Sequence, residues 1–181
     1  MNSSKIIVGN SLYRLKALTS ECINTCVTSV PYWNLRSYLP VNHPSKKYEI
    51  GTEQTPSEYV EHIVEVFREI RRVLRKEGVV FLNIGDSYAG SNQGAGTIIP
   101  TPKQASNRGT NYMTMENHRS ILSKIDGLKP KDLIGIPWSV AFALRNDGWY
   151  LRSDIIWEKP NAMCSSVRDR CTTSHEYLFM L

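Results

Sequence analysis

The sequence predicts an α/β fold, and two of its segments carry this prediction. Residues 55–76 have apolar side chains at the spacing of an amphipathic helix, and the apolar run 79–84 follows directly after Gly78. A helix that leads into a nearly continuous apolar strand is typical of sheets covered on both faces. Residues 149–157 and 176–181 predict two further strands, which we expect to pair antiparallel at the edge of a mixed sheet.

Composition and charge indicate an ordinary globular domain. The chain has 181 residues, of which 41% are hydrophobic and 22% charged, so we expect a single domain over residues 1–181. Its formal net charge of +5 is spread along the chain, which is compatible with a nucleic-acid partner without requiring one. No stretch approaches the ~20 apolar residues of a spanning helix and no signal peptide is evident, so we expect a cytoplasmic protein.

The four cysteines indicate reduced thiols. Cys22, Cys26, Cys164 and Cys171 form neither a C-x-x-C pair nor a dense disulfide framework. A zinc site built from Cys164, Cys171 and His175 is disfavoured, because no fourth ligand is evident. We therefore expect no metal site.

The first elements lead to an aromatic loop, residues 28–33. Residues 5–8 predict a short strand or lead-in, and residues 9–11 predict a turn that caps a helix over 12–18. Residues 23–29 then predict a strand. The polar segment 34–54 predicts a long loop, whose basic residues are either DNA contacts or solvated groups: Arg36, His43, Lys46 and Lys47.

The predicted helix over 55–76 has a clear beginning. Thr55 is the expected N-cap, Pro56 lies at the first helical position, and Glu58 completes a capping box. A basic cluster lies near its end, and helix-end electrostatics explain this cluster better than a DNA site does: Arg71, Arg72, Arg75 and Lys76.

A polar loop at residues 85–88 follows the strand over 79–84. Parallel strands end at one edge of a sheet, where ligands bind in α/β folds, so we expect this loop and the aromatic loop to face one crevice. Residues 89–131 predict a long mobile insertion, and a helix follows from about Asp132 to Gly148. The basic residues of the insertion are either a phosphate-contacting flap or solvated: Lys103, Arg108, His118, Arg119 and Lys124.

The aromatic loop has the groups that a flipped-out base requires. Ser29 offers a hydroxyl acceptor, the Val30 carbonyl is held by the stiff link to Pro31, and Tyr32 and Trp33 offer adjacent aromatic faces. Such a base needs a π surface to stack on and acceptors for its exocyclic amino hydrogens. The alternative is a plain strand-to-loop turn whose aromatic side chains face the core.

The run Ser29-Val30-Pro31-Tyr32 resembles the Ser/Asn/Asp-Pro-Pro-Tyr/Phe/Trp signature of DNA amino-methyltransferases, with Val30 in place of the first proline. Three blocks, the first of which contains this run, resemble consecutive segments of bacterial and phage site-specific DNA methyltransferases of the β arrangement in order and spacing: 28–38, 72–88 and 131–181. Other departures from the pattern of this family are Glu158, Cys164 and Cys171.

This resemblance implies a partial, Rossmann-like class I methyltransferase sheet with S-adenosylmethionine as cofactor. It implies a restriction–modification enzyme that methylates double-stranded DNA on cytosine N4 or adenine N6, with cytosine N4 slightly favoured by Thr28 and Ser29. The cofactor-binding half of proteins in this family contains a Phe-x-Gly-x-Gly motif. The 181 residues contain no such motif, so we expect the chain to stop before that half.

The resemblance also implies roles for single residues. Ser29 and the Val30 carbonyl would accept hydrogen bonds from the target amino group, and Pro31 would hold the turn. Tyr32 would stack on the base, assisted by Trp33. The expected lining of the cavity or cofactor site is Asp86, Ser87, Lys159, Pro160 and Asn161.

Two other classes of function remain open from the sequence. Val30 and the missing glycine motif suit a non-catalytic remnant that binds DNA or a partner, and the same loop suits an RNA- or protein-directed methyltransferase. A partial sheet leaves an open strand edge. We therefore expect a homodimer, association with a complementary chain, or marginal stability alone.

Overall fold

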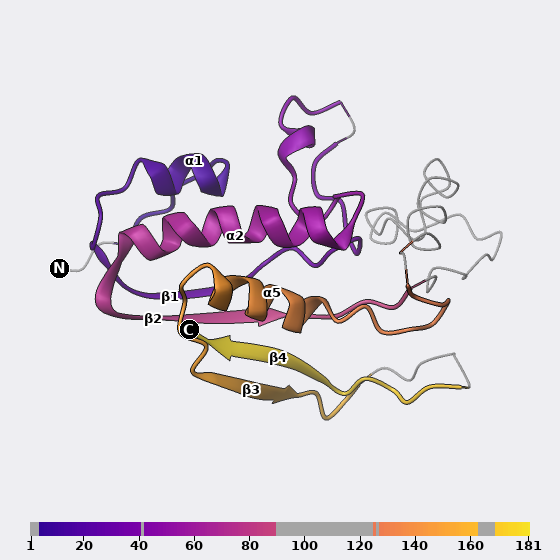
Figure 1. Ribbon diagram of the computed structural model, residues 1–181. Helices are drawn as coiled ribbons and strands as arrows, with labels where there is room; N and C mark the ends of the chain where they lie inside the picture. The colour runs from indigo at the N-terminus through magenta and orange to yellow at the C-terminus, as the bar shows by residue number, and fades with distance from the viewer. Residues whose placement is uncertain (1–3, 41, 90–124, 126, 163–168) are drawn as a thin grey trace.

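The computed structural model describes residues 4–40, 42–89, 125, 127–162 and 169–181. Within them, a four-stranded sheet has the order β1-β2-β4-β3 (Figure 1). The strands are β1 (Ile23–Ser29), β2 (Leu74–Ile84), β3 (Ser153–Glu158) and β4 (His175–Met180). β1 pairs parallel with β2, whereas β4 pairs antiparallel with both β2 and β3. The predicted mixed sheet with an antiparallel pair at one edge is confirmed.

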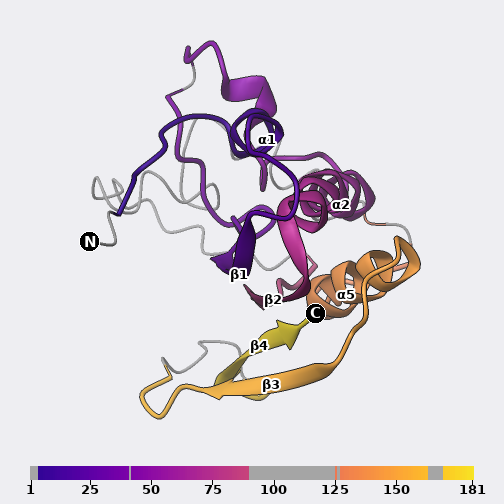
Figure 2. The same ribbon diagram turned by 90° about the vertical axis from the view of Figure 1, so that its left-hand side faces the viewer.

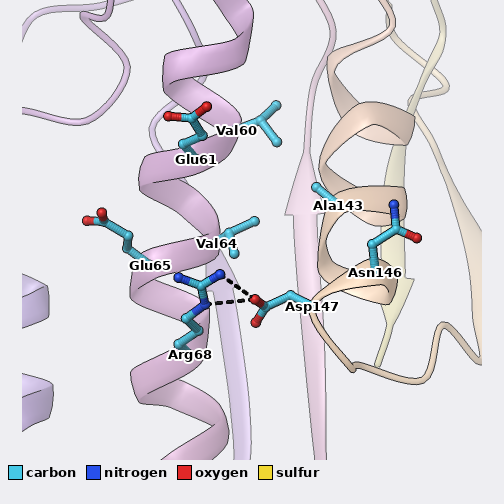
Figure 3. A pocket seen from close by; sticks show the side chains of 8 residues that line it. All are labelled: Val60, Glu61, Val64, Glu65, Arg68, Ala143, Asn146 and Asp147. Carbon is cyan, nitrogen blue, oxygen red and sulfur yellow. Dashed lines mark hydrogen bonds and ion pairs between the residues drawn. The ribbon is translucent and has the colours of Figure 1, made fainter.

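The helices of the described chain lie on one side of this sheet (Figure 2). They are α1 (Ser11–Lys16), α2 (Pro56–Val73) and α5 (Ile136–Asn146), with a short 3₁₀ turn, η1, at Lys46–Tyr48. α2 and α5 lie side by side, and the Arg68 guanidinium bridges them with its Nη2 atom 2.6 Å from Asp147 Oδ1 (Figure 3). This ion pair closes one end of a shallow cleft between the two helices.

The core fills the space between the helices and the sheet. Alternate residues of β2, namely Val80, Leu82 and Ile84, are fully buried. Phe179 of β4 is opposite Leu82 in register and is also fully buried. Trp138 of α5 packs edge-on against Phe179, with ring centroids 5.2 Å apart. The helix layer therefore depends on this single apolar face of the sheet.

The other face of the sheet carries exposed apolar side chains. Val27 of β1 is 75% exposed and Trp157 of β3 is 56% exposed. Phe81, the register partner of Val27, is only partly buried. Among the described residues no helix covers this face, and no strand pairs with the outer edge of β1. Within the described residues, the helices therefore cover the central strand on one face only, and coverage of the second face stays a prediction.

The boundary between α2 and β2 also differs from the prediction. The helix begins at Pro56 as expected, but it ends at Val73 and the strand begins at Leu74, before Gly78. Leu74 already pairs with Ile23 of β1, so sheet pairing ends the helix earlier than the apolar periodicity indicates.

Two other predicted boundaries are wrong. α5 begins at Ile136, because Leu133 forms an isolated bridge with Tyr88 instead of a helical turn. The strand predicted from residue 149 begins at Ser153. Residues 5–8 form no strand, which agrees with the lead-in alternative. The capped first helix is confirmed, since the Asn10 side chain accepts a hydrogen bond from the Tyr13 N–H.

Some predictions lie outside the described residues. The insertion over 89–131 falls there in large part, as do Cys164 and the basic residues of the insertion: Lys103, Arg108, His118, Arg119 and Lys124. The cysteines that the structure describes, Cys22, Cys26 and Cys171, are free. In the described part of the chain, no helix is both long enough and apolar enough to span a membrane.

Replacing the N-cap of α2 tests why this helix begins where it does. Thr55 Oγ1 accepts a hydrogen bond from the Glu58 N–H at 3.2 Å, and Glu58 Oε2 accepts one from the Thr55 N–H at 3.2 Å. We expect Thr55→Ala to lower the free energy of unfolding by about 1 kcal/mol, measured by urea denaturation. Ser57→Ala, on the same exposed turn, is the control. An equal loss in both variants would contradict the capping role.

Candidate active site

Parallel pairing of β1 with β2 brings the two predicted loops together at one edge of the sheet. Ser29, the last residue of β1, is the register partner of Asn83. Beyond the strands, the Ser87 hydroxyl donates a hydrogen bond to the Trp33 carbonyl at 3.4 Å. The predicted meeting of the two loops is therefore confirmed.

Ser29, Tyr32 and Asn83 form a hydrogen-bonded cluster at this edge. The Ser29 hydroxyl donates to Asn83 Oδ1 at 3.3 Å, and the Tyr32 hydroxyl lies 2.9 Å from the same oxygen. The Tyr32 hydroxyl also lies 2.8 Å from Glu176 Oε2 on β4. Asn83 Nδ2 donates to the Tyr177 carbonyl at 3.3 Å. Ser29 itself is exposed, so its hydroxyl oxygen is accessible to a ligand.

The Tyr32 ring lies against the backbone of Gly85. A Cβ atom at Gly85 would lie 2.6 Å from Tyr32 Cε2, a separation that only the absence of a side chain permits. Burial of the phenol, together with the nearby Glu176 carboxylate, raises the pKa of Tyr32 to about 12. The phenol is therefore a neutral hydrogen-bond donor at physiological pH.

Trp33 lies in the core instead of the crevice. Its side chain is 1% exposed, and its indole Nε1–H donates to the Glu53 carbonyl at 3.2 Å. The prediction that Trp33 stacks on a base is wrong, because no face of the ring is open to a ligand. The neighbouring carbonyl of Pro31 accepts a hydrogen bond from the Tyr59 hydroxyl at 3.0 Å, which fixes the turn to α2. Val30 is also buried, so only its backbone remains a candidate for binding.

Asp86 joins the second loop to α5. Its carboxylate accepts hydrogen bonds from the N–H groups of Ser87 at 2.8 Å, Gly135 at 3.1 Å and Ile136 at 3.0 Å. Burial raises the pKa of Asp86, although these three hydrogen bonds oppose the shift. Asp86 also lines a cavity of about 450 Å³ with Gly85 and Glu176. It therefore occupies the predicted cavity edge, with its carboxylate engaged by backbone groups.

Lys159 is connected to the cluster through Glu176. Lys159 Nζ and Glu176 Oε1 form an ion pair. Burial raises the pKa of Glu176, but the hydrogen bonds from Lys159 and Tyr32 outweigh burial and hold this pKa below its usual range. Pro160 and Asn161 are exposed. Of the predicted loop 159–161, Lys159 alone has a described contact with the cluster.

Asn83 and Glu176 are members of the cluster that were not predicted from the sequence. Asn83 is a polar residue within the apolar run 79–84. A polar residue in a buried strand needs hydrogen-bond partners, and this was the sequence feature that could have indicated its role. Glu176 is the second residue of β4 and carries no local signal, because its partner Tyr32 lies 144 residues away in the sequence. Among the described residues, no group of three or more His, Cys, Asp or Glu side chains is placed to hold a metal.

Comparison with known proteins gives consistent similarities. Residues 23–181 match the N6/N4 methyltransferase family described as DNA methylase. The chain is 45% identical over 181 residues to the Type II methyltransferase M.SmaI of Serratia marcescens, covering 100% of this chain and 56% of that protein. It thus spans about half the length of M.SmaI and of the Type II methyltransferases M.Cfr9I of Citrobacter freundii and M.XycI of Xanthomonas campestris.

Two solved structures share the fold. The PvuII DNA methyltransferase (cytosine-N4-specific) has a TM-score of 0.57 at 15% identity, covering 96% of this chain and 46% of that one. A putative DNA modification methylase of Thermus thermophilus, complexed with S-adenosyl-L-methionine, has a TM-score of 0.55 at 17% identity over 96% of this chain and 50% of that one. These likenesses confirm the predicted partial Rossmann-like methyltransferase sheet.

Adding a methyl group at Gly85 tests the packing of Tyr32. We expect Gly85→Ala to lower the free energy of unfolding by roughly 1–3 kcal/mol, because the new Cβ overlaps the Tyr32 ring. In a Tyr32→Ala background the same change should cost little, since the overlapping ring is gone. Urea denaturation of the four proteins of this double-mutant cycle measures the coupling. Additive effects of the two substitutions would contradict the packing described.

Proposed function

The chain belongs to the DNA methylase family of N6/N4 methyltransferases, and from this membership we propose that it forms the base-binding catalytic part of a DNA amino-methyltransferase. The observation that carries this proposal is the position of Ser29, exposed at the carboxyl end of β1 beside the Tyr32 ring. A target base would bind there after leaving the duplex, as enzymes acting on exocyclic groups require.

The chemical task of this site is to make an amino nitrogen nucleophilic. The lone pair of an exocyclic amino group is delocalised into the base ring. Ser29 Oγ and the Val30 carbonyl would accept the two amino hydrogens and draw them out of the ring plane. Catalysis of this kind consists of positioning and electrostatics in a site that excludes water.

Tyr32 would supply the stacking surface. One part of its ring is fixed against Gly85, and the side chain is only partly buried, so area remains for contact with a base. Stacking on an aromatic side chain contributes about 1–3 kcal/mol per base. With Trp33 buried in the core, this contribution rests on Tyr32.

S-adenosylmethionine is the proposed cofactor and supplies the transferable methyl group when bound. The carboxylates at this edge already pair with other partners: Asp86 with backbone N–H groups and Glu176 with Lys159. We propose that Asp86 and Ser87 border the cavity, and that polypeptide outside residues 1–181 supplies most of the cofactor site.

The same polypeptide would complete the sheet. The outer edge of β1 and the face that carries Val27 and Trp157 are exposed in the described chain. An unpaired strand edge beside an apolar face favours association with further strands. We propose that a complementary segment, in the same polypeptide or in a second chain, pairs with β1 and covers this face.

Double-stranded DNA is the proposed substrate, and the net charge of +5 is compatible with it. Cytosine N4 is the proposed position of methylation, with adenine N6 as the next candidate. A role in restriction–modification follows from the Type II methyltransferase relatives, and such a role would place the protein in the cytoplasm.

Loss of the Ser29 hydroxyl tests the proposed chemistry. With labelled S-adenosylmethionine and unmethylated genomic DNA, we expect methyl transfer by the chain joined to its complementary segment. Mass spectrometry of the nucleosides should give N4-methylcytosine. Ser29→Ala should reduce the rate by about 10²-fold, because one acceptor of the amino hydrogens is lost. Ser57→Ala, on the exposed first turn of α2, is the control. Equal rates for Ser29→Ala and the unchanged protein would overturn the assignment of Ser29.

A charge on the open face tests the complementary segment. The part of M.SmaI that this chain does not match is a suitable partner, because the matched part is 45% identical. We expect the two polypeptides to associate in analytical ultracentrifugation. Val27→Lys should weaken association by at least about 10-fold, since it would bury a charge. Ser57→Lys, on the exposed turn of α2, should not weaken it. Equal affinities for both variants would contradict the proposed docking face.

A further inference from the structure

We propose that Asn83 and Glu176 are positioning residues of the catalytic loop, an inference that rests on the proposed function. Asn83 would make Ser29 an obligate hydrogen-bond acceptor, and Glu176 would hold Tyr32 in place. Neither residue lies in the loop itself. Both act through side chains that would touch the base.

The orientation of the Asn83 amide is set by its own neighbours. Asn83 is 8% exposed, so its polar atoms depend on protein partners. Its Nδ2 donates to the Tyr177 carbonyl on β4, and this bond directs Oδ1 toward Ser29 and Tyr32. An amide oxygen has two lone pairs, so Asn83 Oδ1 can accept hydrogen bonds from both the Ser29 and the Tyr32 hydroxyl.

This orientation decides what Ser29 can do. A serine hydroxyl has one hydrogen and two lone pairs. The hydrogen of Ser29 is directed to Asn83 Oδ1 at 3.3 Å, so the exposed oxygen presents lone pairs to the crevice. An amino group entering the crevice can then only donate to Ser29. This is the polarity that withdrawal of the amino hydrogens requires.

Glu176 provides the second constraint. The single phenol hydrogen of Tyr32 is shared between Glu176 Oε2 at 2.8 Å and Asn83 Oδ1 at 2.9 Å. Lys159 pairs with the other oxygen of Glu176, which fixes the carboxylate. The ring of Tyr32 is thus held at its hydroxyl by two strands and at its face by Gly85. Because the ring is already fixed, stacking of a base on Tyr32 costs less side-chain entropy.

Titration of Tyr32 tests the role of Glu176 without an activity assay. The chain has nine tyrosines, so Tyr32 is identified from the difference in tyrosinate absorbance between the unchanged protein and Tyr32→Phe. We expect Glu176→Gln to lower the pKa of Tyr32 from about 12 toward the ordinary value of about 10, because the carboxylate is removed. Glu158→Gln, a carboxylate on the adjacent strand β3, should leave this pKa unchanged. An unchanged Tyr32 titration in Glu176→Gln would overturn the role of Glu176.

Two substitutions at Asn83 separate positioning from packing. Asn83→Leu keeps a similar branched shape but has no acceptor, whereas Asn83→Asp keeps an acceptor oxygen in either protonation state. In the methyl-transfer assay we expect Asn83→Leu to lower kcat by about 10²-fold with little change in KM for DNA. Asn83→Asp should recover at least about 10-fold of that loss. Equal kcat for both variants, with urea denaturation showing both folded, would overturn the role of Asn83.

The two tests fail in different ways. If the proposed function is wrong, no variant transfers methyl groups, yet Glu176→Gln still lowers the pKa of Tyr32. If the positioning roles are wrong, methyl transfer persists in Asn83→Leu and the Tyr32 titration is unchanged in Glu176→Gln. If Asn83→Leu does not fold, the methyl-transfer rate of Asn83→Asp is compared with that of the unchanged protein. Rates within about 10-fold of each other support the acceptor role of Asn83, and a larger loss overturns it.

Discussion

The parallel pairing of β1 with β2 is the constraint on which the candidate site depends. It places Ser29 opposite Asn83 and sends both loops off the same edge of the sheet. A shift of one residue in this register would turn Ser29 to the helix-covered face, because side chains alternate along a strand. Cys26, which packs against the core from β1, opposes such a shift, since it would exchange places with the exposed Val27. The hydrophobic core thus fixes the register, and the register fixes the site.

The sheet is stabilised from one side in the described chain. α2 and α5 bury its even-numbered β2 positions, whereas the opposite face retains exposed apolar groups such as Val27. The candidate site lies at the edge of the sheet, between the helix-covered face and the open face. Ser29 and Asn83 alternate with the buried positions of their strands and so lie on the face that the helices leave open. Whatever covers that face also determines how deeply a ligand is enclosed. Folding of the sheet and completion of the site are therefore linked.

Local features could be predicted from the sequence more reliably than long-range ones. The capping box at Thr55 was predictable, because its partners lie within one helical turn. The early start of β2 at Leu74 was not, because it depends on pairing with Ile23, far along the chain. Trp33 was placed wrongly for the same reason: a Trp in a polar loop gives no sign of whether the core reaches it. Asn83 and Glu176 acquire their meaning only when β1, β2 and β4 come together.

The valine at position 30 shows how tertiary contacts can replace local stiffness. Two consecutive prolines would restrict the backbone of the loop through their rings. Here Pro31 stands alone, but its carbonyl is bound by Tyr59 of α2, and Trp33 is bound by the Glu53 carbonyl. Val30 adds apolar contact because its side chain is buried in the core. The rigidity that a proline would provide within the loop is supplied from α2 and from the segment before it, so the order of the loop depends on the packing of the whole helix layer.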